Sequence, residues 1–140
     1  MTFDDYEEYE RQRDAIREDN KVYLAGFEKW LVGKGLTKKT IDKHVSNVDF
    51  YINLYLCYYD AQDVRQGCSK IDDFLGDWII RKTLWATCGY IKSSAASIKK
   101  FYAFMLEVNV IKEEDYYDLC YTIKEELPFW QDALRRYDEM

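Results

Sequence analysis

The sequence predicts an all-α protein, a compact bundle of four to six helices, on the strength of two observations. One proline and six glycines in 140 residues leave few positions at which a helix must break. Apolar residues also recur every three or four positions through most of the chain, which places them on one face of a helix. Hydrophobic residues make up 48% of the chain, enough for the core of a single helical domain over residues 1–140.

The first predicted helix covers residues 4–32. Residues 1–21 form a polar, acidic helical extension, which is either a separate short helix or a frayed start of the helix that follows. The apolar spacing is better between Val22 and Leu31, so we expect this part to be buried.

A second helix is predicted from Lys38 to about Tyr59. Gly33 and Gly35 end the preceding helix, because glycine readily adopts the left-handed backbone found after a helix. Thr37 can then cap the new helix through its hydroxyl. The apolar face of this helix consists of Ile41, Val45, Val48 and Ile52. Lys39, Lys43, Ser46 and Asn47 fall on the opposite side.

Residues 60–67 are expected to be a polar connection, followed by a helix that Ser69 caps and that ends near Lys82. Thr83 then begins a long helix that runs to about Val108, with Asn109 as its stop. Its apolar seam consists of Leu84, Cys88, Ile91, Ala95, Ile98, Tyr102 and Met105. The opposite face combines small residues with lysines: Gly89, Lys92, Ser93, Ala96, Lys99 and Lys100.

Two more helices are predicted within the acidic C-terminal residues 113–140. The first covers Glu113 to about Glu126. Pro128 suits the first turn of a helix, so we expect a last helix from Phe129 to about Tyr137.

The four cysteines are widely spaced, and His44 is the only histidine. This set lacks the paired spacing of zinc ligands and excludes most catalytic arrangements built on histidine, so we expect no metal, no cofactor and no enzyme. We expect reduced thiols in a cytoplasmic protein. No apolar run reaches the roughly 18 residues of a membrane span, and the acidic first residues are not a signal peptide, so no membrane partner is expected.

Charge is distributed unevenly along the chain. The net charge is −6, but residues 1–19 carry −5 and residues 113–140 carry −6. The central residues 20–112 hold fourteen basic and nine acidic residues, a net charge of +5. A basic centre is compatible with binding to phosphates, although the acidic ends weaken long-range attraction to nucleic acid.

Two short motifs occur in order. The first consists of Trp30-Leu31, Gly35-Leu36-Thr37 and Thr40-Ile41, and the second runs from Ser97 through Phe101-Tyr102 and Phe104-Met105 to Val110-Ile111. Over about residues 22–111 this pattern resembles the N-terminal core-binding domain of tyrosine recombinases, the phage integrase family, a domain of SAM-like type. The resemblance implies a helical bundle that clamps one side of duplex DNA, with its second and fourth helices facing the major groove and the adjoining phosphates.

In the family this domain precedes a catalytic domain, for which the residues after Ile111 are too few. Arg135-Arg136-Tyr137 has suitable residue types for recombinase catalysis, but one terminal tyrosine beside two arginines is more often helix surface. The resemblance therefore implies a non-catalytic DNA-binding module from a mobile element, with a separate recombinase as a possible partner. The acidic residues 1–21 and 113–140 also lie outside the family pattern.

The candidate DNA-contacting residues lie on the two lysine-bearing helices: Thr37, Lys38, Lys39, Thr40, Lys43 and Asn47, and Lys92, Ser93, Lys99 and Lys100. Lysines bind phosphates as point charges, the threonines can do so at a helix start, and the Asn47 amide can pair with adenine. The same lysines also fit a solvated helix face. The alternative function is a helical protein–protein interaction module, whose acidic ends cover the basic face or engage a basic partner.

Overall fold

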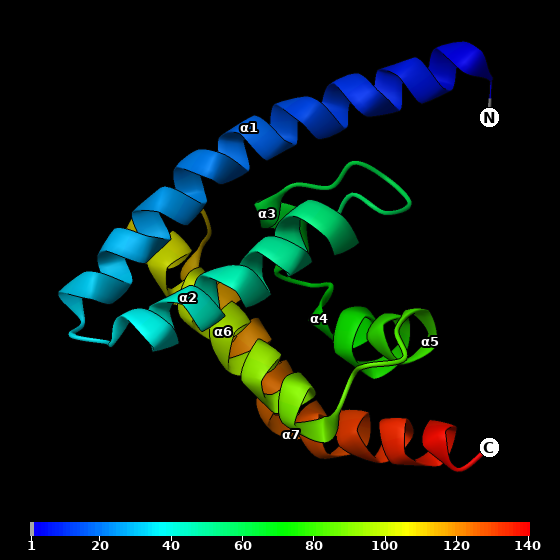
Figure 1. Cartoon of the computed structure of the whole chain (residues 1–140). Helices are drawn as coiled ribbons and strands as arrows, with labels where there is room; N and C mark the ends of the chain where they lie inside the picture. The colour runs from blue at the N-terminus through cyan, green and yellow to red at the C-terminus, as the bar shows by residue number, and fades with distance from the viewer. Residues whose placement is uncertain (1) are drawn as a thin grey trace. The chain divides into compact units, whose positions relative to one another are not determined.

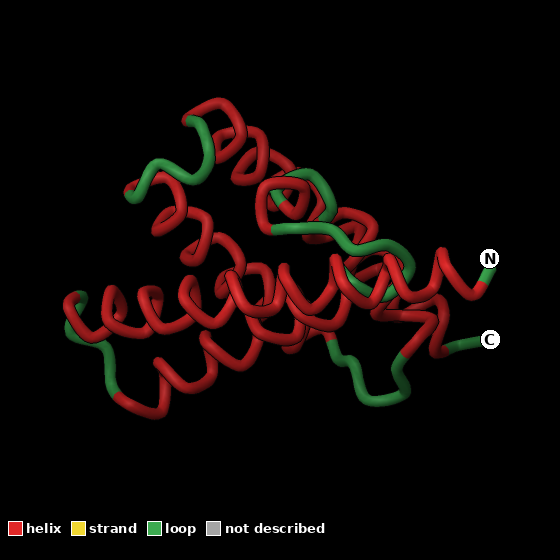
Figure 2. Tube along the Cα trace, turned by 90° about the horizontal axis from the view of Figure 1, so that it is seen from above, coloured by secondary structure: helices red, strands yellow, loops and turns green. Residues whose placement is uncertain are grey.

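The computed structural model describes residues 2–140, and this part of the chain is all-α, as predicted (Figures 1 and 2). It contains six continuous helical segments and no strand. They are α1 (Phe3–Gly33); α2 (Lys38–Asp49) continued by the π-helix η1 (Phe50–Tyr55); α3 (Val64–Gly67); α4 (Ile71–Asp73) continued by the π-helix η2 (Phe74–Trp78) and α5 (Ile79–Lys82); α6 (Cys88–Glu107); and α7 (Glu113–Asp138).

These segments group into two compact units whose boundary lies between Gly67 and Cys68. The first unit contains α1, α2, η1 and α3, and the second contains α4 to α7. The boundary falls inside residues 22–111, the part that resembles the recombinase domain. The single domain that the length predicts and the SAM-like arrangement both stay predictions.

In the first unit, α1 is one continuous helix, so the acidic start is not a separate element. Its first turn is stabilised by a capping box, in which the Thr2 hydroxyl accepts from the Asp5 amide and the Asp5 carboxylate accepts from the Thr2 amide. After the turn at Lys34–Thr37, α2 folds back along α1 (Figure 1). Ile41, Val48 and Ile52 are buried and Val45 is partly buried, as the predicted apolar face requires.

Side chains of α1 hold the end of the second helix. The Arg17 guanidinium donates to the Asn53 carbonyl at 2.9 Å, and Asn20, which is only 1% exposed, donates to Asn53 Oδ1 at 2.7 Å. The Tyr9 hydroxyl donates to the Cys57 carbonyl. A cation near the carbonyl end of a helix is favourable, and here the helix ends at Tyr55 rather than at the predicted Tyr59.

The connection predicted for residues 60–67 contains a short helix, α3, that the sequence analysis missed. Its Val64 is buried, and the Gly67 carbonyl accepts a hydrogen bond of 2.6 Å from the buried Tyr51 hydroxyl. Four residues are too few to give a periodic signal, and this tertiary hydrogen bond has no signature in the local sequence.

In the second unit, α6 and α7 run side by side in opposite directions, and α7 also packs on α4, η2 and α5 (Figure 1). The predicted seam of α6 is confirmed from Ile91 to Met105. The segment formed by α4, η2 and α5 also buries its apolar residues. The buried apolar side chains in these two segments include Ile91, Ala95, Ile98, Tyr102 and Met105, and Ile71, Phe74, Leu75, Trp78 and Ile79.

Two predicted helix starts are wrong. The long helix begins at Cys88, where the Thr87 hydroxyl accepts from the Tyr90 amide, and not at Thr83. Thr83 is extended and donates its hydroxyl to the Ile79 carbonyl at 2.8 Å, which closes the end of the preceding helix. That preceding helix starts after Lys70, without a side-chain cap, and not after Ser69.

The predicted break at Pro128 is also wrong, because α7 continues through it to Asp138. Proline removes one backbone donor and usually kinks a helix. Residues beyond it are held by tertiary packing, since Trp130 and Leu134 are buried. The predicted stop at Asn109 is confirmed: it follows α6 with a positive φ of 65°.

Candidate nucleic-acid interface

The start of α2 is built by the turn that the sequence predicts. Gly35 has a φ of +81°, a conformation that glycine adopts at low cost. This backbone conformation lets the chain turn after the end of α1. Thr37 is the N-cap of α2, and its hydroxyl accepts from the Thr40 amide at 3.3 Å and donates to the Thr40 hydroxyl at 3.0 Å. Thr37 and Thr40 therefore lie together, exposed, at the positive end of the helix dipole.

The lysines of α2 are not equivalent. Lys38 forms an exposed ion pair with Asp42, at 2.8 Å between Nζ and Oδ2, and the hydrogen bond to Asp42 raises the pKa of Lys38. Lys39 and Lys43 are exposed, and within residues 2–140 neither forms an ion pair. Lys39 and Lys43 are one helical turn apart and provide the uncompensated charge of this face.

Asn47 lies on the same helix but is only partly exposed and already has an interaction partner. The Asn47 side chain is therefore less accessible to DNA than the side chains of Lys39 and Lys43 are. His44 is also partly buried, as the sequence predicts.

One further cation lies beside this start, and the sequence analysis missed it. The Lys34 ammonium lies 4.9 Å from the ring centroid of Trp30, in a cation–π contact. A lysine that follows an aromatic residue by four positions lies next to it on a helix surface. This spacing is the sequence signal that could have identified the contact.

The outer face of α6 carries three exposed lysines, Lys92, Lys99 and Lys100. No ion pair involves any of them within the described part of the chain. Ser93 is partly exposed and has an interaction partner. The sequence contains no acidic residue from Trp78 to Leu106, and the one carboxylate of α6 belongs to its last residue, Glu107.

The structure therefore places the ten candidate residues on two surfaces, one in each unit. We name them the α2 face (Thr37, Lys38, Lys39, Thr40, Lys43 and Asn47) and the α6 face (Lys92, Ser93, Lys99 and Lys100). Each surface is a candidate in its own right.

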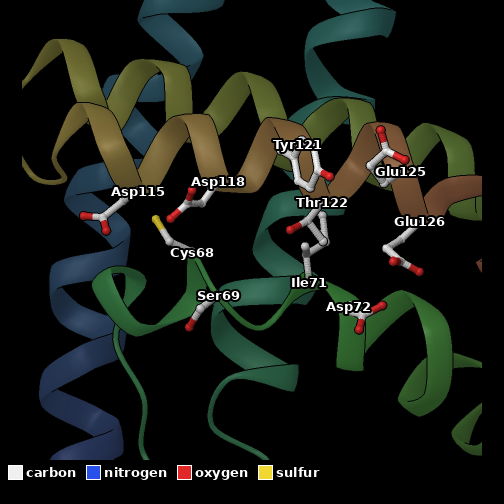
Figure 3. Close-up of a pocket in the computed structure, with 10 residues that line it drawn as sticks. All are labelled: Cys68, Ser69, Ile71, Asp72, Asp115, Asp118, Tyr121, Thr122, Glu125 and Glu126. Carbon is white, nitrogen blue, oxygen red and sulfur yellow. The ribbon is translucent and has the colours of Figure 1, made fainter.

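The second unit also contains an acidic cavity of about 300 Å³ between α7 and the segment that leads into α4 (Figure 3). Its floor includes the buried Cys68 and Ile71. Its wall carries five carboxylates and no basic side chain: Asp72, Asp115, Asp118, Glu125 and Glu126. Figure 3 shows the Cys68 side chain pointing toward α7 on the side of Asp118. A negatively charged cavity of this kind repels phosphate and attracts cations.

Chemically reactive groups are few in the described residues. The four cysteines are free, and burial, with the charge of Asp115, raises the pKa of the Cys68 thiol to about 12, so it stays protonated at neutral pH. No three His, Cys, Asp or Glu side chains of residues 2–140 are placed to hold a metal ion. Arg135, Arg136 and Tyr137 lie exposed near the end of α7, where Arg136 pairs with Asp132.

Comparisons of the chain with protein-family models, with curated proteins and with solved structures give no match. The resemblance to the core-binding domain of tyrosine recombinases therefore stays a prediction from the motifs. Over residues 2–140, no helix has both the length and the apolar composition needed to cross a membrane.

Proposed function

We propose that this chain is a non-catalytic module that binds duplex DNA, with a bundle of the type found in the core-binding domain of phage integrases. The observation that carries the proposal is the α6 face, on which Lys92, Lys99 and Lys100 are exposed, without ion pairs and without a carboxylate between Trp78 and Leu106. Uncompensated lysines on a rigid helix bind phosphates mainly through charge and counterion release.

The shape of the α6 face supports close approach of a DNA backbone. Gly89 and Ala96 lie among the lysines and are exposed, so no bulky side chain stands between the helix and a phosphate. Contacts of this kind give affinity and fix the orientation of a protein on DNA, but they do not read the base sequence.

The α2 face supplies the second contact in the proposal. Lys39 and Lys43 offer two uncompensated charges, and the capped helix start adds the positive end of the helix dipole. Lys38 contributes less, because Asp42 already neutralises it. This arrangement favours binding along the phosphate backbone over base recognition by Asn47.

By resemblance, the process would be DNA integration or recombination in a mobile element, in the cytoplasm, with a separate recombinase as the catalytic partner. The acidic residues of α1 are partly neutralised within the helix, for example in the Glu8–Arg11 and Glu18–Lys21 pairs. Such local pairing reduces their repulsion of a DNA backbone.

Fluorescence anisotropy with a labelled duplex at about 50 and about 200 mM salt tests the proposal. We expect binding at the lower salt that weakens steeply at the higher one. Substitution of Lys39, Lys43, Lys99 and Lys100 by alanine should flatten this dependence. The absence of binding at low salt would overturn the proposal.

The acidic cavity favours a second candidate, a protein–protein interaction module with a basic partner. Five carboxylates line a cavity of about 300 Å³ over a floor of Cys68 and Ile71, which suits the aliphatic stem and charged end of a lysine or arginine side chain. Binding of a lysine-rich peptide, lost in Asp118→Asn with Glu125→Gln, together with no affinity for DNA, would favour this candidate.

A further inference from the structure

The loop between α5 and α6 presents two large apolar side chains to solvent. Leu84 is fully exposed and Trp85 is 53% exposed. The apolar spacing predicts that Leu84 belongs to the buried seam of the long helix, and this prediction is wrong because the helix begins only at Cys88. Burial of a leucine or tryptophan side chain is normally favourable, so their exposure leaves a surface on which a partner can gain free energy.

The ends of this loop are fixed. At one end the Thr83 hydroxyl donates to the Ile79 carbonyl, and at the other the Thr87 hydroxyl accepts from the Tyr90 amide at 3.0 Å. The Trp85 ring packs edge-to-face on the Tyr90 ring, with centroids 4.9 Å apart and an interplanar angle of 89°. Trp85 is thus held in position by one ring while about half of its surface faces solvent.

The charges around the loop indicate what kind of partner it fits. Arg81 and Lys82 precede it and the α6 face follows it, and no acidic residue occurs from Trp78 to Leu106. Arg81 is paired with Asp77 at 2.8 Å, so the uncompensated positive charge near the loop comes from the lysines of the α6 face. An apolar tip next to uncompensated lysines matches a polyanion that also offers flat apolar surfaces, and unstacked DNA bases meet this description.

A lipid surface fits less well. Interfacial membrane binding usually relies on an extended apolar face along a helix, with lysines on the opposite side. Here only Leu84 and Trp85 are apolar and exposed in the loop, and the neighbouring α6 face is made of small residues and lysines. Two side chains are sufficient to wedge into or stack on a base step.

We propose that Leu84 and Trp85 insert at unstacked or unpaired bases while the α6 face holds the flanking phosphates, so that the module prefers distorted DNA over a regular duplex. This inference rests on the proposed DNA-binding function. Base stacking on an aromatic side chain is commonly worth about tenfold in affinity by substitution.

The test compares two fluorescein-labelled probes of the same length, a regular duplex and a duplex with a central mismatched bubble. The wild-type chain should bind the bubble about tenfold more tightly than the duplex. Leu84→Ser with Trp85→Ser should remove this preference and leave affinity for the regular duplex unchanged. Lys99→Ala with Lys100→Ala should weaken binding to both probes equally.

Controls separate this role from a structural one. Trp85→Phe keeps an aromatic ring and should retain most of the preference, and Val108→Ser removes another exposed apolar side chain and should retain all of it. Circular dichroism checks that each variant is folded.

Equal wild-type affinity for both probes would overturn this inference but not the proposed function, whereas binding to neither probe would overturn both. Loss of binding to phosphatidylserine vesicles, with DNA preference unchanged, in the Leu84→Ser, Trp85→Ser variant would assign the loop to membranes instead.

Discussion

The indole nitrogen of Trp130 donates a hydrogen bond of 2.7 Å to Oδ1 of Asp72, which joins the C-terminal half of α7 to α4. Gly76 lies against the same ring, and a Cβ at this position would stand 2.7 Å from Trp130 Cδ1. Trp130 is buried two residues after Pro128. This contact explains why α7 continues beyond a proline that would otherwise favour a break.

Trp130→Phe removes the donor and part of the buried ring. We expect the free energy of unfolding to fall by about 1–3 kcal/mol, from the lost hydrogen bond and the cavity left behind. Urea denaturation followed by circular dichroism measures the change. Asp72→Asn keeps an acceptor at the same position and should cost less; equal stability of Trp130→Phe and wild type would show that the contact does not stabilise α7.

Gly35→Ala tests the turn that positions the α2 face. The φ of +81° at Gly35 is strained for alanine, so stability should fall by about 1 kcal/mol. Gly33→Ala is the matched control, because Gly33 is the last residue of α1 and an added Cβ meets nothing within 4 Å. Thermal or urea unfolding should show the control to be neutral or slightly stabilised. The same loss in both variants would contradict this explanation.

The buried Cys68 thiol should make the free energy of unfolding depend on pH in the alkaline range. Burial, and the charge of Asp115, raise the pKa of the folded thiol from its ordinary 9.0 to about 12. The unfolded thiol therefore ionises first, and the stability associated with Cys68 is complete below pH 9.0 and is lost as the pH rises toward about 12. Between about pH 8 and about pH 10, wild type should lose roughly 1 kcal/mol more than Cys68→Ala does.

Urea titrations at the two pH values measure this difference. Cys88→Ala serves as a control for the loss of a thiol that is only partly buried. Identical pH dependence in wild type and Cys68→Ala would show that the thiol is not held protonated by its surroundings.

Asp42→Asn tests whether Asp42 restrains the α2 face. It releases Lys38 from its ion pair and removes a negative charge near Lys39 and Lys43, so affinity for duplex DNA should rise about two- to fivefold at low salt. Asp132→Asn makes the same charge change by breaking the Asp132–Arg136 pair on α7, outside the proposed faces. Anisotropy titrations should show a smaller effect there, and equal effects would exclude a specific role for the α2 face.

Helix identity and buried faces followed from local patterns, because apolar spacing directly encodes which side of a helix is covered. Thus the seam of α6 and the Thr37 cap were predictable from the sequence. Helix boundaries were less predictable from the sequence. Thr83 and Thr87 are both plausible caps, and the hydrogen bond from Thr83 to Ile79, which decides between them, forms only in the folded chain.

The candidate site was predictable as two lysine-bearing faces but not in its electrostatic detail. The pairing of Lys38 with Asp42 depends on side-chain rotamers, although their spacing of four residues permits it. Continuation of α7 through Pro128 depends on Trp130 meeting Asp72, which is 58 residues away in the sequence. The acidic cavity likewise forms from residues of α7 and the start of α4, which local patterns do not connect.

We propose that the α2 and α6 faces hold DNA through their uncompensated lysines. The most direct test is the slope of log affinity against log salt concentration for a labelled duplex. The slope should become less negative by roughly 2 in Lys39→Ala with Lys43→Ala and by roughly 3 in the Lys92, Lys99 and Lys100 triple alanine variant. Lys124→Ala, on α7, should leave it unchanged. A slope that is the same in the α6 variant and in wild type would show that the α6 face does not contact DNA phosphates.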